Sequence, residues 1–255
     1  IINEEKKNEL IAKDPKSAEI IRPILRGRDI EKYGYNFAGL YVICTFPSRH
    51  YDIDAFPAIK DWLINGDWVL PNAPIGTGQL RLEQTGKEHI VNGVKFKSRK
   101  KTTNKWFETQ DSISYWDDFN KPKIVYGQFR RGSFAFDEKK CCLSSNEYFI
   151  YINDVTKLKL LLGILNSKIC YYFGCISMNS LGGNTTIAQK DIFMKFPVVN
   201  TTESEQQHIV QFVDSILHAD IKHQVTYETE LDRYIYQLYN LTDEEIDFIN
   251  KQTNQ

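Results

Sequence analysis

The sequence predicts an α+β fold, in which a mixed or antiparallel sheet is followed by C-terminal helices. Short β-branched and aromatic runs separated by turn residues dominate residues 1–200, whereas residues 201–255 carry amphipathic stretches with helix-capping signals. The chain has 255 residues, of which 42% are hydrophobic, which is enough for one large domain or two modest ones. We therefore expect one domain over residues 1–200 and a helical C-terminal tail over residues 201–255.

The first half of the chain contains two helix signals and several strand signals. The predicted elements are a helix over 3–13 that Pro15 ends, a buried strand over 40–46, a helix from its cap Asp54 to Leu63, and strands around 90–96 and 106–108. The remainder of residues 71–120 is rich in Pro, Gly, Asn and Thr, which is typical of long loops. Such loops in a compact domain are often functional.

The second half begins with three strand signals and continues with helices. The predicted elements are strands over 123–129, 134–136 and 147–152, a helix from its cap Asp154 to its stop Gly174, a short helix ending at Met194, and two helices opened by the capping boxes Thr202–Glu205 and Thr242–Glu245. The helix after Thr202 carries Ile209, Val213 and Ile216 on one face, which indicates that this face packs on a core.

Charge is distributed unevenly along the chain. Residues 1–200 contain 29 Lys and Arg against 22 Asp and Glu, whereas residues 201–255 contain 3 against 11. This asymmetry predicts a basic body that meets a polyanion, with an acidic appendage. The basic excess is densest in one short run with aromatic neighbours, formed by Lys95, Lys97, Arg99, Lys100, Lys101 and Lys105. The alternative to a nucleic-acid contact is a solvated surface loop.

The sequence contains no P-loop, no CxxC pair and no glycine-rich S-adenosylmethionine loop, so we expect no catalytic, metal or cofactor site in this chain. Four patterns could imitate such sites, and we expect each to be structural: the turn Gly76-Thr77-Gly78, the exposed His218 and His223, the packed pair Cys141-Cys142, and the nuclease-like set Asp118, Glu138 and Lys140 in a polar turn.

The five cysteines are sparse and odd in number, which favours a reducing compartment over a disulfide framework, so we expect a cytoplasmic protein. No apolar run reaches the ~18–20 residues of a membrane span. The sequence begins at Ile1 without an initiator methionine, so we expect it to be a piece of a longer polypeptide.

Five motifs occur in the order found in one family of recognition domains. They are IRPILRGRDIEKY at 21–33, PKIVYGQF at 122–129, LLLGILNSK at 160–168, KFPVV at 195–199 and IYQLYNLTDEEIDFI at 235–249. By these motifs the chain resembles the TaqI-like C-terminal specificity domain, the target-recognition part of type II restriction-modification enzymes. Asn240 replaces the glycine expected in the LYGL turn, but asparagine also tolerates the left-handed backbone of a helix break.

The resemblance implies a module that recognises double-stranded DNA at a defined sequence, similar also to the recognition domains of type I restriction systems. In such enzymes the module follows an adenine-N6 methyltransferase domain of the same polypeptide, and often a nuclease as well. S-adenosylmethionine is then expected in that N-terminal domain, and catalysis only in the parent protein. The matching stretches Leu25–Ile30 and Leu165–Ser167 are expected to be structural or interdomain.

Physical chemistry selects the candidate DNA contacts. Lys and Arg neutralise phosphates, whereas Arg, Asn and Gln also pair with purine edges. The run 95–105 is therefore expected to contact phosphates. The candidate base readers are Arg99, Asn104, Gln128, Arg130 and Arg131, and Asn179, Asn184 and Thr185 of the loop 177–186 are candidates for backbone contact. That loop could equally be a connection between helices. An RNA-binding or protein-docking module without DNA sequence specificity, and a nuclease that uses Glu138 and Lys140, are the alternative functions.

Overall fold

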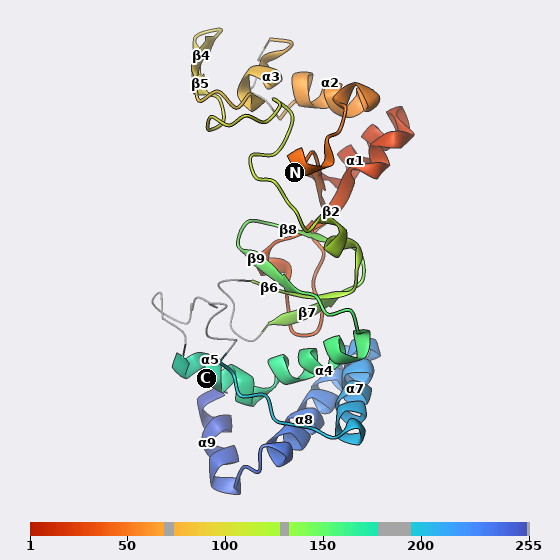
Figure 1. Ribbon diagram of the computed structural model, residues 1–255, viewed down its shortest axis with the longest axis vertical. Helices are drawn as coiled ribbons and strands as arrows, with labels where there is room; N and C mark the ends of the chain where they lie inside the picture. The colour runs from red at the N-terminus through yellow and green to blue at the C-terminus, as the bar shows by residue number, and fades with distance from the viewer. Residues whose placement is uncertain (69–73, 128–132, 178–194, 254–255) are drawn as a thin grey trace. The chain divides into compact units, whose positions relative to one another are not determined.

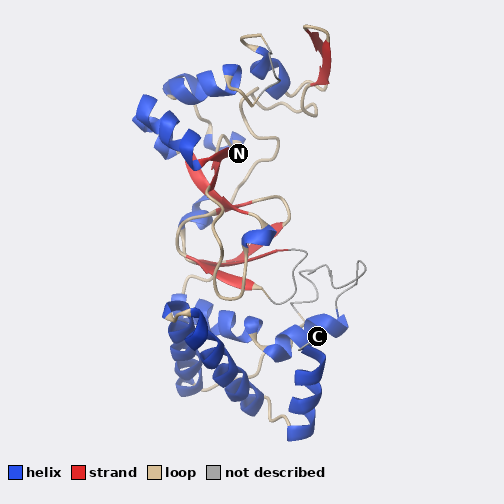
Figure 2. Ribbon diagram, turned by 180° about the vertical axis from the view of Figure 1, so that it is seen from behind, coloured by secondary structure: helices blue, strands red, loops and turns tan. Residues whose placement is uncertain are grey.

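The computed structural model describes residues 1–68, 74–127, 133–177 and 195–253. Contacts between its residues divide the chain into two compact units. Unit 1 comprises Ile1–Pro23 with Gly39–Trp116, and unit 2 comprises Ile24–Ala38 with Asp117–Gln255. Both units contain helices and strands (Figure 1, Figure 2), which confirms the predicted α+β class.

Unit 1 consists of short strands and short helices around a small core. Its elements are β1 (Ile2–Asn3), α1 (Glu4–Lys13), the first part of β2 (Ile21–Leu25), β3 (Leu40–Ile43), α2 (Pro57–Asn65), α3 (Thr77–Leu82), β4 (Glu88–Val91) and β5 (Val94–Lys97), with 3₁₀ turns over Pro15–Glu19, Pro47–Arg49 and Ile53–Ala55. Strand β3 pairs antiparallel with β1 and with β2, and β4 and β5 form a separate hairpin. The buried apolar side chains of the core are Ile2, Leu10, Ile20, Ile21, Ile53, Phe56, Ile59 and Phe107.

Two sequence-based expectations for unit 1 are wrong. Helix α2 starts at Pro57 because proline suits the first turn of a helix, and Asp54 forms an ion pair with Lys60 in place of capping that helix. The stretch expected as a strand at 106–108 is a turn, in which Glu108 N donates to Lys105 O at 3.1 Å. The helix expected over 3–13 is confirmed as α1.

Helix α3 lies in the region that the sequence predicts to be irregular. Gly76 precedes it with a φ of +87°, and Gly78 lies in its first turn. A Cβ at Gly78 would stand 2.2 Å from Leu63 O near the end of α2, so only glycine permits this approach. The sequence Gly76-Thr77-Gly78 therefore starts a helix that packs on α2, and the expectation of a simple turn is corrected.

Unit 2 joins an antiparallel sheet to a group of helices. Its elements are the second part of β2, β6 (Lys123–Gly127), β7 (Phe134–Asp137), β8 (Cys142–Leu143), β9 (Glu147–Ile150), α4 (Val155–Asn166), α5 (Lys168–Ser177), α7 (Glu203–His218), α8 (Ile221–Leu238) and α9 (Asp243–Thr253), with 3₁₀ turns over Gly27–Asp29 and, at the boundary, Trp116–Asn120. Strand β6 lies between β7 and β9, antiparallel to both, and β8 runs parallel to β2. The three strands predicted around 123–152 are confirmed.

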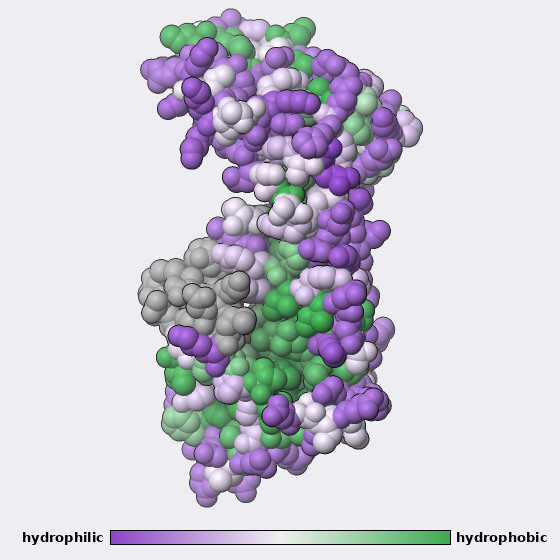
Figure 3. All heavy atoms as spheres, in the orientation of Figure 1, coloured by the Kyte–Doolittle hydropathy of each residue, from purple (hydrophilic) through white to green (hydrophobic). Residues whose placement is uncertain are grey.

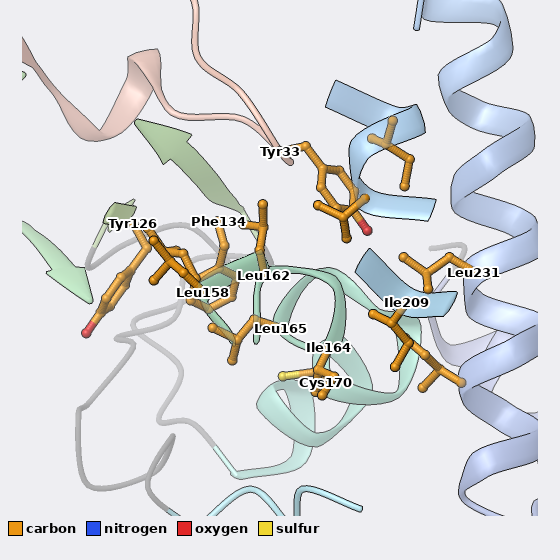
Figure 4. Close-up of a cluster of buried hydrophobic side chains, with 14 of the residues drawn as sticks. Tyr33, Tyr126, Phe134, Leu158, Leu162, Ile164, Leu165, Cys170, Ile209 and Leu231 are labelled. Carbon is orange, nitrogen blue, oxygen red and sulfur yellow. The ribbon is translucent and has the colours of Figure 1, made fainter. Parts of the chain in front are cut away.

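The sheet and the C-terminal helices of unit 2 share one hydrophobic core (Figure 4). Helix α4 packs on β6 and β7 and also on α7, and α7 packs on α8. Close packing at the crossing of α4 and α7 depends on Gly163, because a Cβ there would lie 2.9 Å from Val213 Cγ2. The predicted division at residue 200 does not coincide with the division by contacts. Whether residues 201–255 can be separated from the rest stays a prediction.

The single helix predicted from Asp154 to Gly174 is two helices, α4 and α5, bent by 62°. Ser167 interrupts it, because its Oγ donates to Ile164 O at 2.6 Å and its backbone is extended. The N–H of Lys168, at the start of α5, donates to Asp232 Oδ1 at 2.8 Å. Gly174 is buried inside α5 and does not end it.

Both predicted capping boxes are present. Thr202 N donates to Glu205 Oε2 at 2.7 Å at the start of α7, and Thr242 N donates to Glu245 Oε2 at 2.9 Å at the start of α9.

Among the described residues, no single helix is long and apolar enough to span a membrane. The helices α4 and α5 have that length and apolar character only when they are taken together, and they are bent by 62°.

A fully buried ion pair joins β6 to β7. The side chains of Lys123 and Asp137 are 0% exposed, and Lys123 Nζ lies 2.5 Å from Asp137 Oδ2. The carboxylate also accepts from the hydroxyl of Tyr35 at 2.8 Å and from the backbone N–H groups of Lys139 at 2.9 Å and Cys141 at 3.0 Å. Lys123 Nζ further donates to a backbone carbonyl at 3.0 Å. Every charged group of this pair therefore has several hydrogen-bond partners, as a buried ion pair requires.

Candidate nucleic-acid interface

The basic run begins on the hairpin of β4 and β5 in unit 1. Asn92 and Gly93 form its turn with φ values of +48° and +78°, the left-handed pair that a two-residue hairpin turn requires. The register Glu88↔Lys97 and Ile90↔Lys95 places these four side chains on one face, and all four are exposed.

The other face of the hairpin is fixed by an aromatic contact. The rings of His89 and Phe96 stack with centroids 5.5 Å apart, and His89 Nε2 lies 2.8 Å from Glu83 Oε1. The guanidinium of Arg81 from α3 lies 6.0 Å from the Phe96 centroid. The hairpin is thus attached to the preceding segment through one face, while the lysine face is turned to solvent.

The loop after β5, residues 98–110, is held in place by Gln84. Its side-chain amide donates to the carbonyls of Lys105 at 3.2 Å and Glu108 at 2.8 Å, and it accepts from Thr102 Oγ1 at 2.6 Å. Gln84 is buried, so these bonds lie inside the loop. The sequence offered no signal for this role, because an isolated glutamine has no pattern that marks it as a loop anchor.

Two candidate base readers also support this loop. The guanidinium of Arg99 donates to Leu82 O at 2.6 Å and to Trp106 O at 2.5 Å, and burial lowers the pKa of Arg99. Asn104 Nδ2 donates to the carbonyls of Thr109 and Gln110, both at 3.0 Å. Both side chains are engaged with backbone carbonyls, and their assignment as base readers stays a prediction.

The lysines of the run differ in their surroundings. Lys95 pairs with Glu88 at 2.8 Å, with both side chains more than 60% exposed, and such surface pairs contribute little. Lys105 Nζ reaches Tyr51 O at 3.5 Å. Lys97, Lys100 and Lys101 are exposed and make no ion pair within the part of the chain that the structure describes. The ordered loop and hairpin therefore present three unpaired positive charges to solvent. On the face drawn in Figure 3, hydrophilic residues also cover much of unit 1.

The remaining candidates, Gln128, Arg130, Arg131, Asn179, Asn184 and Thr185, lie outside the described residues, as does the helix expected to end at Met194. The expectation that Arg130 and Arg131 lie near the basic run stays a prediction.

The motif LRGRDI has a structural role in unit 2. Arg26 Nε and Nη2 donate to the two carboxylate oxygens of Asp29 at 2.9 and 2.7 Å, and the Asp29 pKa is lowered by this bond. Gly27 N donates to Glu147 Oε1 at 2.7 Å, and a Cβ at Gly127 would lie 3.2 Å from Gly27 Cα. The glycines therefore allow the motif to approach the end of β6.

The motif LNS is also structural. Asn166 Oδ1 accepts from Phe134 N at 3.1 Å, and its Nδ2 donates to Phe134 O at 2.8 Å, so this side chain pairs with the start of β7 as a neighbouring strand would. Asn166 and Ser167 are buried. These contacts show a structural role for the residues that make them, and an interdomain role stays a prediction.

The patterns that imitate catalytic sites have ordinary surroundings. Asp118 pairs with Lys121 at 2.9 Å, while Glu138 and Lys140 are exposed. Cys141 and Cys142 are buried, and burial raises the pKa of the Cys141 thiol to about 12, so it is protonated at neutral pH. Within the described ranges, no three His, Cys, Asp or Glu side chains are grouped to hold a metal ion.

Comparison with known proteins gives matches to one sequence family and to solved structures. The sequence model of the TaqI-like C-terminal specificity domain matches residues 22–198. Among solved structures, the chain is similar to the type IIL restriction-modification enzyme MmeI in complex with DNA, with a TM-score of 0.57 and 14% identity, over 99% of this chain and 33% of that chain. The chain thus spans a third of the length of that relative, and at this identity the likeness concerns the fold alone. No curated protein matches the sequence.

Proposed function

Because the chain belongs to the family of TaqI-like C-terminal specificity domains, we propose that it is the DNA-recognition module of a restriction-modification enzyme. The observation that carries the proposal is the ordered hairpin and loop of unit 1, which present Lys97, Lys100 and Lys101 without acidic partners among the described residues. Exposed lysines held by a rigid scaffold are suited to neutralise backbone phosphates. The similarity in fold to an enzyme in complex with DNA supports the same reading.

We further propose that the module binds double-stranded DNA at a defined sequence and positions an adenine-N6 methyltransferase domain of the same polypeptide. That domain would bind S-adenosylmethionine. The support is that the structural match includes 99% of this chain but only 33% of the MmeI chain. A restriction-modification parent of that size has room for a catalytic part beside the recognition module.

In this proposal the candidate side chains of the module have different tasks. Arg99, Asn104, Gln128, Arg130 and Arg131 are the proposed base readers, and of these Arg99 and Asn104 also hold the loop through backbone carbonyls. These residue types pair with guanine or adenine edges in the major groove. Lys97, Lys100 and Lys101 supply affinity without sequence preference.

The proposed function is tested by comparing three nucleic acids. We expect the chain to bind labelled duplex DNA more tightly than single-stranded DNA or RNA of the same sequence in fluorescence anisotropy, with heparin as competitor. Affinity should fall steeply as salt increases, because binding releases counterions. Equal or tighter binding of RNA, or no binding to any of the three, would favour an RNA-binding or protein-docking module instead.

Replacing Lys97, Lys100 and Lys101 together with alanine should weaken binding to all duplexes alike. Each lost phosphate contact should reduce the slope of log affinity against log salt by about 0.9. A matched control is the triple alanine variant of Lys139, Lys157 and Lys222, which are exposed lysines of unit 2 and remove the same charge. If both variants lose affinity equally, the effect reflects net charge and the loop is a solvated surface.

A further inference from the structure

A second group of cations in unit 1 lies on a chain of aromatic rings, and of these cations only Lys105 is among the DNA contacts that the sequence suggests. We call this group the cation–aromatic row. Its cations are Lys16, Arg22, Arg49 and Lys105, and its rings are Phe56, Tyr51 and Trp116. All of these residues belong to unit 1.

The row can be followed from one contact to the next. Lys16 Nζ lies 5.0 Å from the Phe56 centroid, and the rings of Phe56 and Tyr51 meet edge to face with centroids 5.8 Å apart. The guanidinium carbon of Arg49 lies 6.0 Å from the Tyr51 centroid.

The same Arg49 guanidinium carbon is 5.8 Å from the centroid of Trp116, and the guanidinium carbon of Arg22 lies at the same distance from that ring. Lys105 joins the row through its Nζ, 3.5 Å from Tyr51 O. The row is therefore continuous with the basic run of the loop.

None of the four cations has a carboxylate within ion-pair distance among the described residues. This differs from α1 of the same unit, where Lys6, Lys7 and Lys13 each pair with a glutamate. Contacts with aromatic rings hold a cation in place and do not neutralise it. Gathering like charges on neighbouring rings is unfavourable unless an anion joins them.

One atom of Arg22 also lacks a hydrogen-bond partner within the described ranges. Its Nε is buried and has no hydrogen-bond partner in the described part of the chain. An unpaired buried donor is costly, so hydrogen bonds do not explain the burial of this atom. Its contact with Trp116 holds the guanidinium in a fixed place.

The accessible charged groups of the row suit a phosphate. Phe56 and Trp116 are buried, so their rings cannot receive a base. Lys16, Arg49 and Lys105 are exposed, and Arg22 is half-buried. A ring under a long side chain limits its rotamers, so less entropy is lost when an anion binds.

We propose that the cation–aromatic row is a second phosphate-binding surface, which contacts the DNA backbone in addition to Lys97, Lys100 and Lys101. This inference rests on the proposed function. It adds four positioned contacts, of which Arg22 and Arg49 can grip a phosphate with the planar fork of a guanidinium.

The test replaces Arg22 and Arg49 with glutamine, singly and together, in the whole chain. We expect affinity for two duplexes of unrelated sequence to fall equally, and the salt slope to decrease by about 1.8 for the double variant, from two contacts at about 0.9 each. The matched control is Lys13→Gln with Arg233→Gln, which removes the same charge from exposed residues outside the row. Circular dichroism monitors folding in each case.

Further variants keep the outcome clear if Arg22→Gln disturbs the fold. Arg49→Lys should keep most of the salt slope, whereas Lys16→Gln with Arg49→Gln, both at exposed positions, should lower it. If this last variant is folded and keeps full affinity and slope while the triple lysine variant loses both, the row is not a phosphate surface. Absence of duplex binding by the unaltered chain would instead overturn the proposed function, and this inference with it.

Discussion

Replacing Asp137 with alanine is expected to lower the free energy of unfolding of unit 2 by about 3–5 kcal/mol, the usual cost of leaving one partner of a buried ion pair alone. Lys123 is 0% exposed, so its ammonium would lose its counter-charge without gaining water. The hydroxyl of Tyr35 and the N–H groups of Lys139 and Cys141 would also lose their acceptor. A loss of this size is a large fraction of the stability of a typical domain.

The measurement is urea denaturation with two optical signals. The four tryptophans, Trp62, Trp68, Trp106 and Trp116, all lie in unit 1, whereas the long helices lie in unit 2. Far-ultraviolet circular dichroism should therefore show the destabilisation, and tryptophan fluorescence should move less. The control is Glu88→Ala, which breaks the exposed pair with Lys95 and should cost no more than about 0.5–1 kcal/mol. An equal cost for the two variants would mean that the buried pair contributes no more than a surface pair.

Deleting residues 203–255 is expected to abolish the cooperative unfolding of unit 2. The deletion removes α7, α8 and α9, and with them the fully buried Ile209, Val213 and Leu231 that cover α4. Truncating one such core side chain costs about 2–5 kcal/mol, so losing several exceeds the ~5–15 kcal/mol by which a domain is stable. The exposed face of α4 should also make the protein aggregate.

Circular dichroism and size-exclusion chromatography check this expectation. The substitution Glu230→Lys is the control, because it changes an exposed charge on α8 without uncovering the core. A soluble, monomeric deletion variant in which the sheet of unit 2 still unfolds cooperatively would mean that residues 201–255 are a separable tail, as the sequence predicts.

The elements that sequence predicts well are those whose signals are local. The capping boxes Thr202–Glu205 and Thr242–Glu245 satisfy N–H groups within the same turn, and the strands β6, β7 and β9 carry their β-branched and aromatic residues consecutively. The break between α4 and α5 is different, because an apolar pattern continues through Ser167. At this break the first N–H of α5 donates to Asp232, which lies on α8 and is distant in sequence. Such a stop cannot be recognised from neighbouring residues.

The candidate interface shows the same limit. Composition identifies the basic run, but only tertiary partners separate Arg99, which is engaged with two carbonyls, from Lys97, which points to solvent. Arg22 and Trp116 are distant in sequence and meet only in the fold. No spacing rule connects them, so this contact could not have been predicted.

The two units are discontinuous in sequence, and this restricts how this chain can be recombined with a related one. The segment Ile24–Ala38 belongs to unit 2, where Tyr33 shares backbone hydrogen bonds with β7 and Tyr35 contacts Asp137. A chimera with a single crossover anywhere between residues 39 and 116 would join parts of unit 1 from two parents. Exchange of unit 1 as a whole requires Ile1–Pro23 and Gly39–Trp116 to come from the same parent, with three junctions inherited together. Engineered hybrids, and natural ones produced by gene conversion, should therefore survive mainly when their junctions fall beside Pro23, Ala38 and Trp116.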